Sequence, residues 1–564
     1  MKPLLIIACV ACLLYANTLT NDLVFDDAYV VTGQKAIRHP WNLREIFGGR
    51  YYGELREQDP LYRPLTIWAL ALNDGLNRAF GLPGEHPVGF HLTNVFLHAL
   101  VGCALYWFLT GAGISTGASL TASLLFAAHP IHTEAVASVV NRSELLAALF
   151  GLAFLTLHRR RNWMAVGCYL LAMWSKESAA AFLAVAVWTD VCFPGKRSTW
   201  PLARYAGYAA ALTTWVGLRA MAVGDRSLPI PRPDNPLVDV SLLERVWTAG
   251  RVQFDYLRLQ AWPVGLSSDY SLNQVPVVSG WFDAGALVFL GIVIAGAVAS
   301  WRLWGRHPVV VFSTAGYAIL FSPTSNFLFP IGTIMGERLA YAPSIFFCLL
   351  AGYGLWALCR GKRRVAVGAV GAVLVFYSGL TVSRNRTWAN DSVFCQTQVR
   401  SAPNSAKAHY GAARQYLVAG DLDRGIGHLR QCLEISPERP AVWNTLGTAY
   451  IQKGDPHAAA RVFQEALRIY KNRPGIYYNL GRAYQLMGAY APATEAFLSA
   501  IRLDRTFVEA YINLGGVYFQ TDRLSDARAA WRRGLNLDPG SQVLQDNLKA
   551  LEDMGREGNT KSQR

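Results

Sequence analysis

The chain has 564 residues, of which 52% are hydrophobic and 16% are charged, and its mean hydropathy is +0.19. Soluble domains carry about 25% charged residues, so this composition excludes a disordered chain and argues against an ordinary cytosolic enzyme. The formal net charge of +15 would suit nucleic acid or anionic lipid. Much of the basic charge, however, lies in short loops between apolar runs. Membrane topology therefore explains the charge better, and we expect no nucleic-acid partner.

The apolar runs begin at the N terminus. The stretch Met1 to Leu19 has Lys2 in front of it and no small-residue cleavage signal behind it, which predicts a retained first transmembrane helix. Later runs that approach the roughly 20 residues a span needs are 89–110, 203–221, 281–301, 342–359 and 365–382. Shorter runs, which can span where their polar flanks are buried in protein or face a water-filled cleft, are 117–129, 145–157, 163–175, 178–193 and 308–321. These runs predict an all-α membrane domain of about eleven transmembrane helices over residues 1–383.

The basic loops set the predicted orientation. They are Arg159–Arg161, Lys196–Arg197, Arg302 with Arg306, and Arg360 with Lys362–Arg364. Eleven spans place all of them on the side of Lys2, which the positive-inside rule makes cytoplasmic. The opposite side then receives the segments 21–88, 130–144, 176–177, 222–280 and 322–341, and everything after residue 383. Segment 246–263 mixes charged and aromatic residues, which favours an interfacial amphipathic helix over a span.

The C-terminal part has a 34-residue period. Its units are 406–439, 440–473, 474–507 and 508–541. They resemble tetratricopeptide repeats, pairs of helices that stack into an α-solenoid. We expect a linker over 384–405 before them, and a capping helix with a polar tail over 542–564 after them. The concave face of such an array would bind an extended peptide or protein; a purely structural stalk is the alternative.

Two adjacent carboxylates follow the first predicted helix. Asp26 and Asp27 lie in the sequence NDLVFDDAYV, on the predicted extracytoplasmic side. Such a pair can supply a general base or bind a metal ion. A solvated loop or a helix cap is the alternative interpretation.

The segment 127–150 is unusually polar for its position between two apolar runs. It contains His129, His132, Glu134, Arg142 and Glu144, and ionisable groups near a membrane are often functional. A metal site is disfavoured because HPIHTE breaks the i,i+4 spacing of helical ligands and no cysteine accompanies it. Arg142 is a candidate ligand for a lipid phosphate, or it forms an ion pair with one of the two glutamates.

Further cations lie next to carboxylates on the same predicted side. Lys176 adjoins Glu177, so the two form an ion pair or the lysine binds a phosphate. Arg338 follows Glu337 just before a clear span, which suits a headgroup phosphate, with a snorkelling anchor as the alternative. Another cation on this side is Arg63, in the sequence YRPLT.

These motifs together resemble a known family. FDDAYV, YRPLT, FHLTNVFLHAL, HPIHTEAVASVVNRSELLA, SKESA, SNFLFPIGTIMGERLAYAPS and RNRTWAND occur in this order. Over about residues 5–545 the chain resembles the transmembrane and tetratricopeptide-repeat-containing proteins and their bacterial relatives. The resemblance implies a C-type glycosyltransferase fold, protein O-mannosylation with a polyprenyl-phosphate-linked sugar as donor, and an acidic motif in the first extracytoplasmic loop.

By position, that acidic motif falls on Asp26 and Asp27. The implied reaction is a single inverting displacement, in which a carboxylate takes the proton of an acceptor Ser or Thr and cations stabilise the leaving phosphate. We take Asp27 first as the base, and Asp26 as the residue that orients the acceptor or contacts the donor. The sequence alone does not decide between the two assignments. Candidate phosphate ligands are, in order, Arg338, Arg142 and Lys176. The other site candidates are His129, His132, Glu134, Glu144, Glu177, Glu337 and Arg63. A divalent metal is left open, with Asp26 as its ligand if one is used.

Two other classes of function compete with the enzyme. One is a membrane-anchored adaptor whose repeats recruit partners, although an anchor needs neither the acidic pair nor eleven spans. The other is a polyprenyl-lipid transporter, which should show broken helices and repeats across its two halves. In the enzyme hypothesis the partners are membrane lipid, the lipid-linked sugar and a protein acceptor on the repeats. Compact loops fit a bacterial protein of the inner membrane, whereas a eukaryotic one would lie in the endoplasmic reticulum. The array of four repeats is shorter than in the animal members of the family, which leaves the class of acceptor open.

Overall fold

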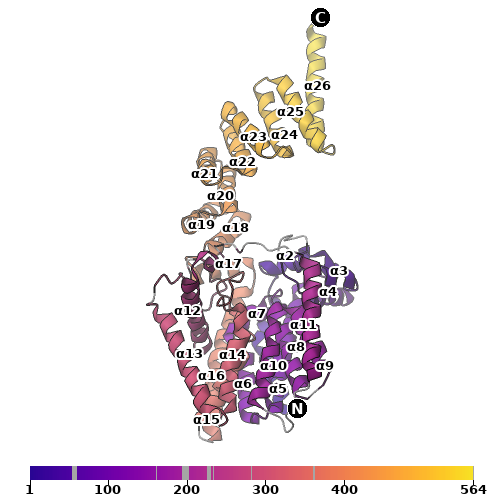
Figure 1. The fold of residues 1–564 in the computed structure, drawn as a ribbon. Coiled ribbons are helices and arrows are strands. Elements are labelled where there is room, and N and C mark those ends of the chain that lie inside the picture. Colours follow the sequence, from indigo (N-terminus) through magenta and orange to yellow (C-terminus); the bar gives the residue numbers. More distant parts are fainter. Residues whose placement is uncertain are drawn as a thin grey trace. The chain divides into compact units, whose positions relative to one another are not determined.

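The computed structural model describes residues 1–562 except 54–59, 161, 194–201, 225–229, 231, 233, 273, 281 and 360–361, and gives only the backbone of residues 202 and 555–562. Every regular element in these residues is a helix, as predicted (Figure 1). The chain forms two compact units, residues 1–404 and 405–564. Four of the basic residues that set the predicted orientation lie outside the described residues: Arg161, Lys196, Arg197 and Arg360.

Unit 1 is a helical bundle. Its α-helices are α1 (Lys2–Tyr15), α2 (Asp26–Gly33), α3 (Leu43–Gly48), α4 (Pro64–Ala79), α5 (Pro87–Gly111), α6 (Thr116–Ala128), α7 (Thr133–Ala137), α8 (Arg142–Arg159), α9 (Met164–Ser175), α10 (Phe182–Cys192), α11 (Leu202–Val223), α12 (Leu242–Ala261), α13 (Ala284–Leu303), α14 (Pro308–Phe321), α15 (Ser344–Leu358), α16 (Arg363–Asn385) and α17 (Asp391–Ser401). Short 3₁₀ turns that matter below are η3 (Pro130–His132), η4 (Glu177–Ala181), η7 (Glu337–Ala340) and η8 (Arg386–Trp388). Figure 1 shows α2, α3 and α17 at one end of this unit and the N terminus of the chain at the other.

Several helices of unit 1 are apolar enough to cross a membrane. Four described helical segments have sufficient length: Lys2–Thr20, Pro87–Gly111, Ala284–Leu303 and Arg363–Trp388. A fifth arises if the pair Pro130–Ala137 and Arg142–Arg159, bent by 110°, is one span. Shorter apolar helices are Thr116–Ala128, Met164–Ser175, Pro308–Thr324 and Ser344–Leu358. A membrane-embedded unit is thus supported, whereas the count of about eleven spans stays a prediction.

The first and last helices of the bundle are joined at the end that carries α2. The Asn17 side chain donates to the Val382 carbonyl (3.0 Å), and the Asn385 side chain donates to the Leu14 carbonyl (2.9 Å). One turn further, the Asp22 amide donates to the carbonyl of Ala389 (2.9 Å). Much of the segment predicted as a linker, 384–405, is helical and packs within unit 1. It therefore helps to position the loop that leads into α2.

Unit 2 consists of helix pairs that follow one another along the chain (Figure 1). They are α18 (Ala406–Val418) with α19 (Leu422–Ile435), α20 (Pro440–Gln452) with α21 (Pro456–Ile469), α22 (Pro474–Leu486) with α23 (Tyr490–Leu503), and α24 (Val508–Gln520) with α25 (Leu524–Leu537), followed by α26 (Gln542–Ser562). Each pair falls within one predicted 34-residue unit. Small residues let the paired helices approach: in the last three pairs, an aromatic ring of the second helix lies over a glycine of the first. A Cβ on Gly447 would lie 2.2 Å from the Phe463 ring, and one on Gly481 would lie 2.7 Å from the Phe497 ring.

We expect Gly447→Ala to destabilise unit 2 by about 1–3 kcal/mol, the usual cost of forcing extra atoms into a packed core. The new methyl group cannot fit without displacing the buried Phe463 ring. Chemical denaturation followed by far-UV circular dichroism measures the loss. The matched control is Gly475→Ala, where nothing lies within 4 Å of the added Cβ. Equal stability of the two variants would contradict this account of the helix pairing.

Candidate active site

Asp27 links the first loop to the turn between α7 and α8. The carboxylate is buried, and its Oδ1 accepts hydrogen bonds from the Ser138 hydroxyl (2.9 Å) and the Val140 amide (2.8 Å). Its Oδ2 accepts one from the Val139 amide (2.8 Å). Burial raises the pKa of Asp27 to about 7, while the three hydrogen bonds act to lower it. A buried carboxylate with three donors directed at it is suited to holding the loop in place.

Asp26 is the first residue of α2 and is partly exposed. Phe25 before it has a φ of 57°, a left-handed conformation that costs a bulky residue about 1–3 kcal/mol. The Phe25 amide donates to Asp391 Oδ1 (2.9 Å), and its ring packs on Phe394 of α17 with centroids 6.0 Å apart. These contacts fix the direction in which α2 starts, and with it the position of Asp26.

Arg338, on η7, pairs directly with one carboxylate, that of Glu134. Its backbone amide donates to Glu134 Oε2 (3.0 Å), and its guanidinium forms an ion pair with the same carboxylate. The Glu134 carboxylate raises the pKa of Arg338 most, and the more distant Glu144 and Asp26 add to the effect. The Glu134 side chain is 3% exposed and that of Arg338 is 36% exposed. The arginine therefore stays accessible from outside, and it lies within electrostatic range of Asp26.

The neighbouring Glu337 is fully buried and makes a separate set of contacts. Its carboxylate accepts hydrogen bonds from the Arg384 guanidinium (3.2 and 3.3 Å), from the Tyr270 hydroxyl (2.9 Å) and from the Ser267 amide. Burial raises the pKa of Glu337 to about 7, against the opposing effect of Arg384. Glu337 thus joins η7 to α16 and to the loop after α12.

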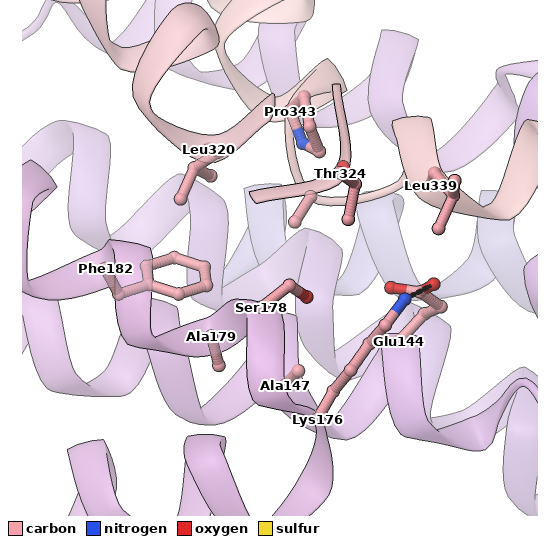
Figure 2. A pocket seen from close by; sticks show the side chains of 11 residues that line it. Glu144, Ala147, Lys176, Ser178, Ala179, Phe182, Leu320, Thr324, Leu339 and Pro343 are labelled. Atoms are coloured by element: carbon pink, nitrogen blue, oxygen red, sulfur yellow. Dashed lines mark hydrogen bonds and ion pairs between the residues drawn. The ribbon is translucent and has the colours of Figure 1, made fainter. Parts of the chain in front are cut away.

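Lys176 and Glu144 form a buried ion pair at one end of a narrow pocket. Figure 2 shows the lysine extending to the glutamate; the other side chains that line the pocket are apolar except for the hydroxyl-bearing Ser178 and Thr324. The pocket holds about 10 Å³, room for no more than one water molecule. Its lining residues are Glu144, Ala147, Lys176, Ser178, Ala179, Phe182, Leu320, Thr324, Leu339, Ala342 and Pro343. A cation thus lies at the polar end of an otherwise mainly apolar slot between α8, η4, α14 and η7.

Glu177, next to Lys176 in sequence, pairs with a different residue. Arg63 donates to both of its carboxylate oxygens, at 2.9 and 2.6 Å. Burial opposes the charged form, but the Arg63 guanidinium lowers the pKa of Glu177 to about 2. The structure therefore joins each member of the sequence pair to a partner from a distant part of the sequence.

Arg142 lies inside the bundle. It is fully buried, and the acceptors of its guanidinium are all neutral. They are Asn94 Oδ1 (2.8 Å), Asn73 Oδ1 (2.9 Å) and the carbonyls of Ala69 (3.0 Å) and Phe90 (3.0 Å). These groups belong to α4 and α5, so Arg142 connects three helices. It faces neither Glu134 nor Glu144, and it is not accessible to a lipid headgroup.

The two histidines of the 127–150 segment are buried and hydrogen-bonded. His129 Nε2 lies 2.9 Å from the Gln260 carbonyl, and its Nδ1 accepts the Ile131 amide (3.2 Å). His132 Nδ1 lies 2.8 Å from the Phe126 carbonyl. Each ring thus contacts the backbone as a neutral histidine does. Over the described part of the chain, no three His, Cys, Asp or Glu side chains form a group that would hold a metal ion.

The structure joins six of the expected residues as three ion pairs: Arg338 with Glu134, Lys176 with Glu144, and Arg63 with Glu177. The Glu144 and Asp26 carboxylates also contribute to the raised pKa of Arg338. Sequence reasoning missed four contributors: Asp391, which holds the Phe25 backbone, and the Ser138 hydroxyl and the Val139 and Val140 amides, which hold Asp27. Asp391 lies in the RNRTWAND motif, whose place in the chain was the only available signal for it.

Comparison with known proteins confirms the repeats and the resemblance. A family model described as "TPR repeat" matches residues 447–488, and one described as "Tetratricopeptide repeat" matches residues 474–507. Protein O-mannosyl-transferase TMTC1 of Homo sapiens is 28% identical over 503 residues, covering 78% of this chain and 56% of that protein. Protein O-mannosyl-transferase TMTC4 of Mus musculus is 26% identical over 493 residues, covering 76% of this chain and 65% of that protein. The chain thus spans less than two thirds of the length of these curated relatives.

Solved structures match over a smaller part of the chain. The crystal structure of MamA is 21% identical, with a TM-score of 0.25, and covers 26% of this chain and 85% of that one. YrrB, described as a TPR protein with an unusual peptide-binding site, is 16% identical with a TM-score of 0.26 and covers 35% of this chain and 97% of that one.

Proposed function

We propose that this chain is an integral-membrane glycosyltransferase that moves a sugar, mannose in the first instance, from a polyprenyl-phosphate donor to Ser or Thr of protein acceptors. The observation that supports the proposal is that Arg338 stays 36% exposed although it pairs with Glu134, and that the partly exposed Asp26 is one of the carboxylates that raise its pKa. In a displacement with a phosphate leaving group, a base removes the proton of the acceptor and a cation stabilises the charge on the phosphate. The similarity to proteins named protein O-mannosyl-transferases supports the choice of sugar and acceptor.

The proposed topology has eleven spans and a C-type glycosyltransferase fold. The spanning helices are α1, α5, α6, α8, α9, α10, α11, α13, α14, α15 and α16. With the basic loops in the cytoplasm, α2, α7, η4, η7 and unit 2 lie on the extracytoplasmic side. The donor would then enter from the outer leaflet, and acceptors would be engaged by the repeats, in the periplasm or in the lumen of the endoplasmic reticulum.

The geometry favours Asp26 over Asp27 as the catalytic base. Asp27 has three hydrogen-bond donors directed at it and is buried, so it has little capacity to receive an acceptor proton. Asp26 is partly exposed on the same turn of helix. In the proposed reaction Asp26 removes the proton from the acceptor hydroxyl, and the resulting oxygen displaces the phosphate at the anomeric carbon. One displacement inverts the configuration there.

Two cations are placed to stabilise the leaving phosphate. Arg338 is the more accessible, and Lys176 lies at the polar end of the mainly apolar pocket in Figure 2. In this proposal the donor phosphate replaces a glutamate as the partner of each cation, while the first isoprene units lie against Phe182, Leu320 and Leu339. Because the pocket holds about 10 Å³, donor binding requires it to widen. In this proposal Arg142 stabilises the helical bundle and does not bind the donor phosphate.

The proposed reaction uses no metal ion. Among the described residues, no three His, Cys, Asp or Glu side chains lie together as a set that could hold one. The three donors on Asp27 also take up the lone pairs that a cation would use. The acid–base and electrostatic groups named above carry the proposed reaction.

The test uses the full chain in nanodiscs with radiolabelled polyprenyl-phosphate mannose and an acceptor mixture from membranes. We expect label to become protein-bound and free polyprenyl phosphate to appear in equal amount, only when both donor and acceptor are present. A folded protein that transfers no label from any lipid-linked sugar would overturn the proposal and favour the adaptor. Movement of the intact donor across the bilayer without cleavage would favour the transporter.

A further inference from the structure

The first helices of the repeats share a face that the proposed reaction does not explain. A pocket of about 400 Å³ lies between α18 and α20, the first helices of the first two repeats. It is lined by Leu417, Val418, Asn444, Thr445, Thr448, Ala449 and Gln452. Its walls therefore combine amide and hydroxyl groups with a few apolar side chains, and none of the lining residues is charged.

Side-chain hydrogen bonds continue this face along the array. Asn479 donates to Asn444 (2.6 Å), and Gln485 donates to Gln520 (3.2 Å). The Asn513 amide likewise donates to a tyrosine hydroxyl on α22 (3.0 Å). Each bond joins residues 35 positions apart, on the first helices of successive repeats. Each amide carries two N–H donors and an oxygen with two lone pairs, so one such bond leaves further hydrogen-bonding capacity.

Charge is distributed unequally between the two helices of the repeats. The four first helices carry four charged side chains, whereas the four second helices carry thirteen. Helix α20, which supplies most of the pocket, carries none. A face of this kind offers no cluster of cations for an acidic peptide and no cluster of carboxylates for a basic one. It suits a ligand that is neutral and rich in hydrogen-bonding groups.

We propose that this face binds an uncharged, extended polypeptide segment rich in Ser and Thr. Extended backbone presents N–H and C=O groups at regular intervals, which Asn444, Thr448 and Gln452 can pair with. Leu417 and the 87% exposed Val418 supply apolar contacts for a side chain of such a segment. The proposal rests on the proposed function, because it names the class of acceptor that the membrane unit would modify.

The test measures binding of fluorescent twelve-residue peptides to the full chain in nanodiscs by fluorescence anisotropy. The peptides are a neutral one of Gly, Ser, Thr and Val, and matched versions in which four residues are Glu or Lys. We expect the neutral peptide to bind at least tenfold more tightly than either charged version. Replacing Thr448 and Gln452 together by Leu should weaken its binding at least tenfold. The matched control is Arg461→Ala, at an exposed position of the second helix α21.

Each outcome decides the proposal. Tighter binding of a charged peptide, no binding of the neutral one, or equal binding by the Thr448→Leu, Gln452→Leu variant would overturn it. Binding is measured without donor, so it is independent of sugar transfer. Neutral-peptide binding without transfer would retain this inference and count against the proposed function. Sugar transfer without binding of the neutral peptide would overturn this inference and retain the proposed function.

Discussion

Asp26→Asn is expected to lower sugar transfer by about 10²–10⁴-fold, the usual contribution of a general base. The amide keeps the size and much of the polarity of the carboxylate but cannot take the acceptor proton. Because Asp26 is partly exposed, the folded protein and its melting temperature should be nearly unchanged. The measurement is the transfer rate in nanodiscs alongside thermal unfolding. Asp22→Asn, an exposed acidic residue of the same loop, is the matched control and should keep full activity.

The variant Asp27→Asn distinguishes the role of Asp27 from that of Asp26. An asparagine here would direct its NH₂ group at a backbone amide of Val139 or Val140, leaving buried donors without an acceptor at a cost of about 1–3 kcal/mol. We therefore expect its melting temperature to fall and its activity to drop through misplacement of the loop. If Asp26→Asn stayed active while Asp27→Asn lost activity at unchanged stability, the two roles would have to be exchanged.

Arg142→Met is expected to destabilise unit 1 by at least about 3 kcal/mol, enough to prevent recovery of a monodisperse protein. The substitution leaves two asparagine oxygens and two carbonyls without their donor inside the bundle, and each orphaned group costs about 1–3 kcal/mol. Arg338→Met should instead give a folded protein whose transfer falls about 10²–10³-fold, through loss of charge stabilisation at the phosphate.

The measurement for this pair of variants is the melting temperature in detergent together with the transfer rate per mole of folded protein. Arg302→Met, at an exposed arginine near the end of α13, is the control for removing a basic side chain. A stable Arg142→Met protein that has lost only donor binding would indicate that Arg142 binds the donor phosphate. A stable, fully active Arg338→Met protein would show that Arg338 does not bind it.

The sequence predicted the repeats well because their stability is local. Each helix pair buries its own face, so the 34-residue period alone locates α18 to α25. The eleven apolar runs likewise correspond to helices of unit 1, although length and composition support only four or five of these as spans.

The site was predictable as a set of residues but not as a set of partners. Lys176 and Glu177 are neighbours in sequence, yet they pair with Glu144 and Arg63, which lie 32 and 114 residues away. Arg142 was expected to meet a glutamate or a phosphate, but α4, which the hydrophobic pattern did not reveal, supplies neutral acceptors. The ranking of Asp26 and Asp27 depends on donors more than a hundred residues further along. Such contacts follow from helix packing, which spacing within one segment does not encode.

The contact between the acidic loop and the end of unit 1 also bears on how the protein is made. The Phe25 amide donates to the Asp391 carboxylate, 366 residues later in the chain. The nearby Asp22 amide donates to the carbonyl of Ala389. While a chain is still emerging from the ribosome, those acceptors do not yet exist. The backbone at Asp22 and Phe25, and with it the start of α2 at Asp26, therefore takes its final geometry only after the last helix of the bundle has been inserted. Assembly of the membrane unit and maturation of the site are then completed in the same step of biosynthesis.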